Sequence, residues 1–364
     1  MLSIDFSAYY SVDIESNLVV KQSSGQLDAN IKNYIIEHLV NIHQEEDIRK
    51  YSIKQNQSTQ VLTCMNQILE TDIDESKFEY AQQIVDRLLE KEVETQAKIN
   101  HLNNELQKGG LIITHFTNES RKFFVIAKVH FIDVRMESNF EKEKATPEKE
   151  HMLKAIIIPI DNNSVTYETE ENYALVTDST KSKGSLAATF WWKEFLELNV
   201  IITDKDNTNK AFNRIDGYLR KKFFDQEYKM DYFFSRNSLI SYMKSSPSFT
   251  FNTAVDSIMG DFSTLDYISE LPTNEVKEAE KTKIIEEIKR LNKNKNDEII
   301  FDGNFAIDKK AIKAKMKKVI KLDTSISLTL DDEIQNLRDK IVAGTDEKGN
   351  HIKIYSEQGY NEFK

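Results

Sequence analysis

A Gly109-Gly110 pair divides two stretches of opposite periodicity, and this change limits the fold more than any other feature of the sequence. Upstream, apolar residues recur at three-and-four spacing from Phe78 to Val93 and continue at Leu102 and Leu106, which predicts one long helix. Downstream, LIITHF and KFFVIAKVHFIDVRM are strand-like and flank a polar segment at 117–120, which predicts a β-hairpin. A helix followed by an antiparallel hairpin indicates an α+β fold.

Elements on both sides of this hairpin complete a mixed N-terminal sheet-and-helix domain. A strand at Leu18 to Lys21 comes first, and Asp28 is placed to cap a helix whose apolar residues run from Ile31 to Ile42. After the hairpin, the segments Ala155 to Pro159 and Tyr173 to Thr177 are predicted to be strands of the same sheet.

A chain of 364 residues is too long for one typical core, and the pattern of predicted helices and strands changes twice along it. We expect an N-terminal α+β domain with the central hairpin at 1–184, a helical region at 185–296 and a small C-terminal α+β domain at 297–364. Within the last domain the pattern predicts a strand at 298–302, a helix from 309 to 321, a strand at 325–331, a turn of helix and a terminal hairpin over 347–350.

The composition restricts the compartment and the partners. The sequence has 49 Lys and Arg against 60 Asp and Glu, a net charge of −11, so phosphate repels the chain at long range unless its positive charge is clustered. Its single cysteine, Cys64, cannot form an internal disulfide, which suits a reducing cytoplasm. Because no stretch approaches 18 uninterrupted apolar residues, no membrane partner is expected.

The strongest local candidate for phosphate contact is the predicted helix at 309–321, where seven lysines accompany one acid, Asp308. At 100° per residue, five of these lysines fall on one arc beside an apolar arc that includes Ile312 and Met316. They are Lys309, Lys310, Lys313, Lys317 and Lys321. The alternative is a solvated helix face without a binding role, because charged stripes are common on exposed helices.

A second basic cluster comprises Arg214, Arg220, Lys221 and Lys222. Aromatic residues at 218, 223 and 224 accompany it, and mixed basic and aromatic groups are typical of single-strand binders. Since these aromatics have helical spacing, the alternative is that they belong to the core. Arg121 and Lys122 at the hairpin turn form a third, weaker candidate.

No catalytic fingerprint is present. The sequence lacks phosphate-binding glycine loops, nucleophile elbows and zinc motifs, so no cofactor and no metal site are expected. His115 and His130 could face each other across the hairpin, although no third ligand is near. Trp191 and Trp192 are expected in the core. Pairs such as Glu287 and Lys289 resemble nuclease sites, which leaves a metal-dependent nuclease as an open alternative to a non-enzymatic protein.

Several segments, in this order, resemble the bacterial nucleoid-associated protein family of NdpA and YejK. LVVKQSSGQLDANIKNYIIEHL resembles its opening strand, turn and helix, and KGGLIITHFTNESRKFFVIAKVHFIDVRMESN its glycine-led hairpin. GSLAATFWWKEFLELN is similar to its central aromatic segment, and FAIDKKAIKAKMKKVIKLDTSISLTLD to its last domain. The charged segment at 141–150 and residues 204–209 depart from the pattern.

This resemblance implies association with the nucleoid, either by binding DNA or by binding proteins that act on DNA, and it implies no catalytic residues. The alternative is an interaction or phage-defence component that docks onto a DNA-acting partner without touching DNA. A homodimer is compatible with the long helix that begins at Phe78.

Overall fold

The computed structural model describes residues 2–21, 32–33, 35–40, 48–53, 59–102, 106, 109–119, 121–130, 152–160, 173–178, 189–296 and 298–364. The chain divides into two compact units, Met1–Ile202 and Thr203–Lys364. Unit 1 is built on an antiparallel sheet with helices, and unit 2 is mostly helical with small two-stranded sheets. The predicted α+β class is confirmed.

The described part of unit 1 centres on an eight-stranded sheet in the order β2-β1-β4-β5-β6-β7-β3-β8, in which each recorded pairing is antiparallel. The predicted hairpin forms its middle, and the predicted strands at 155–159 and 173–177 lie beside it. The strands are β1 (Ser3–Asp13), β2 (Leu18–Lys21), β3 (Arg49–Ile53), β4 (Gly109–Asn118), β5 (Arg121–His130), β6 (Met152–Ile160), β7 (Tyr173–Asp178) and β8 (Leu198–Val200).

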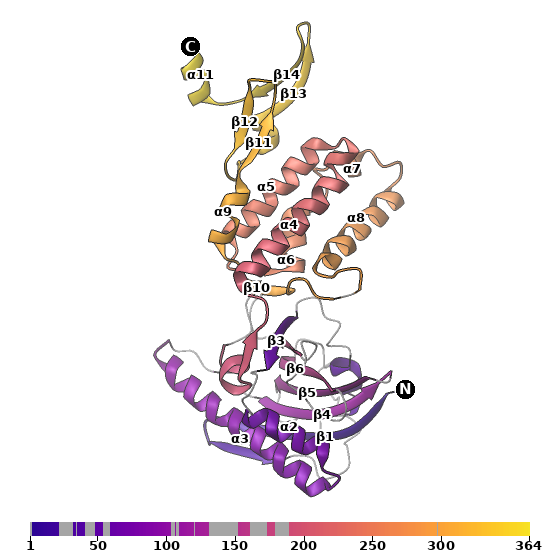
Figure 1. Ribbon diagram of the computed structural model, residues 1–364, viewed down its shortest axis with the longest axis vertical. Helices are drawn as coiled ribbons and strands as arrows, with labels where there is room; N and C mark the ends of the chain where they lie inside the picture. Colours follow the sequence, from indigo (N-terminus) through magenta and orange to yellow (C-terminus); the bar gives the residue numbers. More distant parts are fainter. Residues whose placement is uncertain are drawn as a thin grey trace. The chain divides into compact units, whose positions relative to one another are not determined.

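Both faces of this sheet are apolar. Helices α2 (Gln60–Glu70) and α3 (Asp74–Ile99) cover one face, where Leu111 and Ile113 of β4 point toward them (Figure 1). Ile112 points to the other face, which holds a separate cluster with the π-helical turn η1 (Ile35–Leu39). The long predicted helix is confirmed as α3, but its predicted continuation is wrong. The α-helix ends at Ile99, a 3-10 turn, η3 (Asn100–Leu102), follows, and Leu106 lies outside any helix. The predicted cap at 28 and the loop at 141–150 lie outside the described residues.

The helices of unit 2 enclose one apolar core (Figure 1). Aromatic packing dominates it, with Phe249 stacked on Phe305 at a centroid separation of 4.8 Å. The elements are α4 (Asp204–Lys222), η7 (Phe224–Gln226), α5 (Lys229–Ser245), β9 (Ser248–Thr250), α6 (Phe251–Met259), α7 (Asp266–Ser269), α8 (Asn274–Lys289), η8 (Arg290–Asn292), β10 (Asn304–Ala306) and α9 (Lys309–Met316).

The strand predicted at 298–302 is wrong. Strand β10 begins only at Asn304 and pairs with β9, whereas Ile299 forms an isolated bridge with Lys293. Asp302 is instead fixed by the side chain of Asn207, which accepts from its backbone N–H at 2.8 Å and donates to its carboxylate at 2.7 Å. A buried side-chain clamp thus replaces the ladder hydrogen bonds that a strand would need.

Apolar contacts set the extent of each unit. Phe190 and Trp191, in the π-helical turn η6 (Phe190–Phe195), are buried in the core of the sheet. Phe301, Phe305 and Ile312 are buried with helices α4 to α8. Residues around 190, which the predicted boundaries place in the helical region, therefore pack with the N-terminal sheet. Residues 301–312, which they place in the C-terminal domain, pack with the helices of unit 2.

Beyond α9 the chain forms a segment that we call the C-terminal arm, residues 318–364. It contains the hairpin β11 (Lys318–Lys321) with β12 (Ser327–Leu330), the turn α10 (Leu337–Lys340), the hairpin β13 (Ile341–Asp346) with β14 (Gly349–Ile354), and α11 (Glu357–Phe363). The predicted strand at 325–331 and the terminal hairpin are confirmed. Gly349, with a φ of +111°, occupies a conformation that favours glycine at the tip of that hairpin.

The helix predicted through residue 321 is wrong after Met316. Lys317 is extended, with φ −63° and ψ 127°, and the next four residues form β11. The guanidinium of Arg236 donates to the carbonyl oxygens of Lys315 at 2.6 Å and Met316 at 3.2 Å. These carbonyls therefore have partners where the helix ends, and pairing with β12 satisfies the following backbone.

Candidate nucleic-acid interface

Helix α9 presents one side to the core and the other to solvent. Ile312 and Met316 are buried among the helices of unit 2, and the Asp308 carboxylate caps the helix by accepting from the N–H of Lys310 at 2.9 Å. The side chains of Lys309, Lys310 and Lys313 are exposed. Because residues three and four apart lie on the same face of a helix, these three ammonium groups are neighbours.

The other two lysines of the predicted arc, Lys317 and Lys321, lie beyond the end of the helix. Lys317 follows its last residue, and its Nζ lies 3.6 Å from the Asp331 carboxylate between exposed side chains. Lys321 is exposed at the end of β11. The single helical arc of five lysines is therefore wrong, and three lysines share α9.

The exposed lysines keep their charge available. In the part of the chain that the structure describes, no ion pair is recorded for Lys309, Lys310, Lys313 or Lys321. The remaining two lysines of the run turn inward: Lys315 donates to Asn213 Oδ1 at 2.8 Å, and Lys318 to the Tyr232 hydroxyl at 3.3 Å. Burial lowers the pKa of both Lys315 and Lys318.

The fold adds one lysine that sequence reasoning missed. Lys205 on α4 is exposed and lies four residues before Asn209, so the two share a helix face. The carbonyl oxygen of Asn209 accepts from Lys315 Nζ at 3.3 Å, which places this turn of α4 against α9. No local signal links Lys205 to α9, because about a hundred residues separate them.

Two members of the basic cluster on α4 have internal partners. Arg214 donates to the carbonyl oxygens of Leu291 at 3.0 Å and Lys293 at 2.9 Å. Lys222 is largely buried and forms ion pairs with Glu280 and, at 3.9 Å, with Glu287. Both residues thus fasten α4 to α8 and the turn that follows it.

The other two members of this cluster lie at the surface. Arg220 Nε is 3.7 Å from Asp225 and its guanidinium lies over the Phe224 ring, while Lys221 is exposed. Phe223 is fully buried and Tyr218 donates to Glu287 at 2.8 Å, so these aromatic rings belong to the packing of unit 2. A binding role for the cluster stays a prediction, with Arg220 and Lys221 as its accessible members.

The hairpin turn exposes Arg121 and Lys122, but its histidines are not paired. In the β4–β5 register His115 lies opposite Phe124 and His130 opposite Gly109, so the expectation that they face each other is wrong. Among the described residues no group of three side chains could hold a metal ion. Trp191 is buried in the core, and Trp192 packs on Tyr51 at a centroid separation of 5.0 Å.

The comparison with protein families identifies the chain's relatives. The family model described as nucleoid-associated protein YejK matches residues 11–349, across both units. The chain belongs to this family. Membership of the YejK family makes it a nucleoid-associated protein. No curated protein matches the chain. Within the described residues, no helix is long and apolar enough to cross a membrane.

Proposed function

We propose that this YejK-family protein binds the DNA phosphate backbone directly, in the cytoplasmic nucleoid, through the exposed lysines of α9 together with Lys317 and Lys321. The observation that carries the proposal is the group of three neighbouring, exposed ammonium groups at 309, 310 and 313. Each is a compact point charge that neutralises a phosphate without reading a base. The interaction is therefore expected to have little sequence preference.

The net charge of −11 does not oppose such a contact at short range. At physiological ionic strength the Debye length is about 8 Å, so carboxylates farther away are largely screened from a phosphate that lies against α9. Asp308, which precedes these lysines in the sequence, caps the helix by accepting from the N–H groups of Lys310 and Ala311. Local positive charge is then what a bound phosphate experiences.

The packing of α9 makes the lysine group a fixed platform. Its buried residues anchor one side in the core, and Arg236 holds the carbonyl oxygens at its last turn. Lysines on a fixed helix lose only side-chain freedom when they bind, since the backbone is already ordered. Lys205 is in position to extend the platform on the side of α4.

The salt dependence of binding to duplex DNA, measured by fluorescence anisotropy, tests the proposal. The triple variant Lys309→Gln, Lys310→Gln, Lys313→Gln is expected to bind more weakly and to lose about 2.7 units from the slope of log K against log salt, roughly 0.9 for each phosphate contact. A matched control carries Lys277→Gln, Lys281→Gln and Lys283→Gln on α8, which removes the same charge elsewhere. Equal slopes for the wild type and the α9 variant would contradict the proposal.

The alternative function is docking onto a DNA-acting or defence protein without direct DNA contact, and the acidic net charge favours it. This alternative predicts no binding to DNA alone at low salt. The same samples with Mg²⁺ test the nuclease alternative, because cleaved DNA would contradict a non-enzymatic role.

A further inference from the structure

The C-terminal arm has almost no core of its own. Of residues 318–364, all of them described, only Leu337 is buried. Its two hairpins are separate two-stranded sheets, and in Figure 1 they extend with α11 beyond the helices of unit 2. An isolated two-stranded hairpin is marginally stable in water, so these elements need a further surface to pack against.

Large apolar side chains are exposed on the arm. Ile352 and Ile354, two residues apart on one face of β14, are 46% and 48% exposed. Tyr360 and Phe363, three residues apart on α11, are 63% and 96% exposed. We call these four residues the arm patch. Helix α11 buries none of its seven residues. A helix of this length is too short to be stable in isolation.

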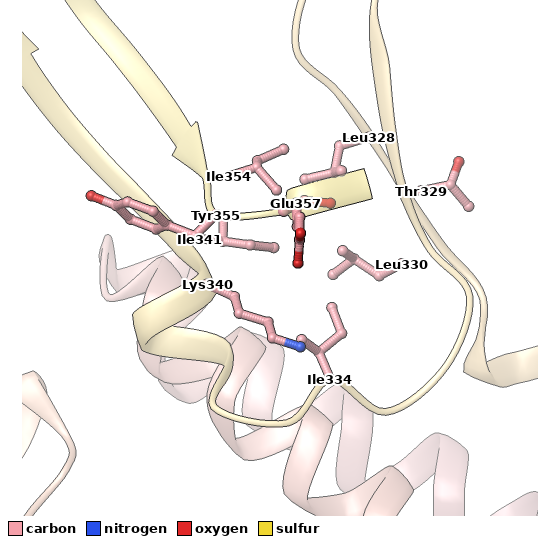
Figure 2. A pocket seen from close by; sticks show the side chains of 10 residues that line it. Leu328, Thr329, Leu330, Ile334, Lys340, Ile341, Ile354, Tyr355 and Glu357 are labelled. Atoms are coloured by element: carbon pink, nitrogen blue, oxygen red, sulfur yellow. The ribbon is translucent and has the colours of Figure 1, made fainter. Parts of the chain in front are cut away.

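A cavity of about 450 Å³ opens beside this patch, between the two hairpins. Leu328, Leu330, Ile334 and Ile354 give it an apolar lining, to which Lys340 and Glu357 add charged groups of opposite sign. Figure 2 shows Leu328 and Leu330 on the side of β12 and Ile354 on the side of the terminal hairpin. Phe363 is almost fully exposed and therefore does not fill this cavity in its own chain.

We propose that the arm is the interface for a second copy of this chain, with Tyr360 and Phe363 of each copy entering the cavity of the other. A two-fold dimer needs one surface that complements itself. The arm carries both halves of such a contact, because α11, which bears the two exposed aromatic residues, begins at Glu357 in the lining of the cavity.

Area and charge agree with a second copy as the occupant. With 150–250 Å² for an aromatic side chain and 60–120 Å² for an aliphatic one, the arm patch exposes on the order of 300–500 Å². A standard interface buries about 800 Å² per partner, of which roughly 65% is apolar in homodimers, or about 500 Å². The arm has seven Lys and Arg against nine Asp and Glu, so two copies repel each other little.

Three contacts hold residues 332–338 of the arm against α5. Asn237 hydrogen-bonds the backbone of Ile334, Lys244 pairs with Asp332 at 3.0 Å, and Arg338 pairs with the buried Asp231. These contacts fix the side of the cavity that Ile334 and Lys340 line, which lowers the entropy lost when a partner binds there.

Sedimentation velocity over a dilution series of the full chain tests the proposal. The wild type is expected to be a dimer, and the double variant Tyr360→Asp, Phe363→Asp a monomer, with a dissociation constant raised on the order of a hundredfold or more. Both residues are exposed, so the substitutions leave the fold intact. The control Ile73→Asp introduces a charge at a residue of unit 1 that is 63% exposed, and it should remain dimeric.

A second measurement locates the contact. Because Cys64 is the only cysteine and is buried, any disulfide between two chains must form through the introduced cysteines. An oxidised equimolar mixture of Phe363→Cys and Leu330→Cys chains is expected to give a disulfide-linked heterodimer that neither variant gives by itself. A monomeric wild type, a dimeric aspartate variant, or a mixture without the heterodimer would overturn the proposal. The lysines of α9 lie outside the arm patch, so a failure of the dimer test and a failure of the DNA-binding test can be told apart.

Discussion

The side-chain amide of Asn237 forms two hydrogen bonds with the backbone of one residue, Ile334. The N–H of Ile334 donates to Oδ1 at 2.7 Å, and Nδ2 donates to the carbonyl oxygen of Ile334 at 3.0 Å. The amide thus replaces the partners that a neighbouring strand would supply at this point. It joins α5 to the start of the C-terminal arm across 97 residues of sequence.

Removing this amide should loosen the arm without unfolding unit 2. Asn237→Ala leaves both backbone groups of Ile334 without their partner, at a cost of about 1–3 kcal/mol. We expect faster hydrogen exchange at amides 341–354 and unchanged exchange in the buried turns of α4 and α5. The exposed Asn361→Ala on α11 is the control. Faster exchange throughout unit 2 would show that Asn237 supports the helical core rather than the arm.

Protonation of His115 should destabilise unit 1 in mild acid. Its ring is largely buried between Phe6 and Phe124, with centroid separations of 5.9 and 6.2 Å. Burial lowers its pKa from 6.5 to about 4, although Asp5, at 3.7 Å, opposes the shift. Since the unfolded chain binds the proton first, this contribution is complete above pH 6.5 and is lost as the pH falls toward 4. The loss is on the order of 3 kcal/mol.

Urea unfolding of the wild type and His115→Phe between pH 7 and 4 measures this contribution. The variant keeps an aromatic ring between the two phenylalanines and has no proton to gain, so its free energy of unfolding should fall less over this range. His101→Phe, at an exposed residue, is the control and should follow the wild type. Parallel curves for wild type and His115→Phe would mean that other groups set the acid sensitivity.

Helices and strands that bury one regularly spaced set of apolar side chains can be predicted from the local sequence. Helix α3 and the β4–β5 hairpin follow from apolar spacing alone, and both are confirmed. Strand β1 was not predicted, although its signal was present: Phe6, Ala8, Tyr10 and Val12 alternate and are all buried in the same cluster. Tyr9, between them, is buried in the cluster on the other face, which makes the alternation easy to overlook.

Features that depend on distant contacts could not be predicted. Lysine and alanine favour helix, so nothing local ends α9 at Met316. Arg236 and the pairing of β11 with β12 end it instead. The same holds for Lys222, whose partner Glu280 is 58 residues away. Composition shows where basic residues cluster, but only the fold decides which of them remain exposed.

A buried ion pair between α3 and β5 provides the sharpest test of the packing in unit 1. The Lys128 ammonium donates to the Glu92 carboxylate, and both side chains are almost completely buried. Since each charge is separated from water, removing one partner leaves the other uncompensated. Glu92→Leu or Lys128→Met alone should therefore cost about 3–5 kcal/mol of unfolding free energy.

The double variant Glu92→Leu, Lys128→Met should recover most of this loss, because two apolar side chains of similar volume avoid the desolvation cost of both charges. Urea unfolding of the four proteins gives the coupling energy. The pair Lys98 and Glu194, exposed and 3.2 Å apart, is the matched control, and its cycle should give less than about 1 kcal/mol. If the two single losses simply added in the double variant at Glu92 and Lys128, the ion pair would not be what keeps these charges in the core.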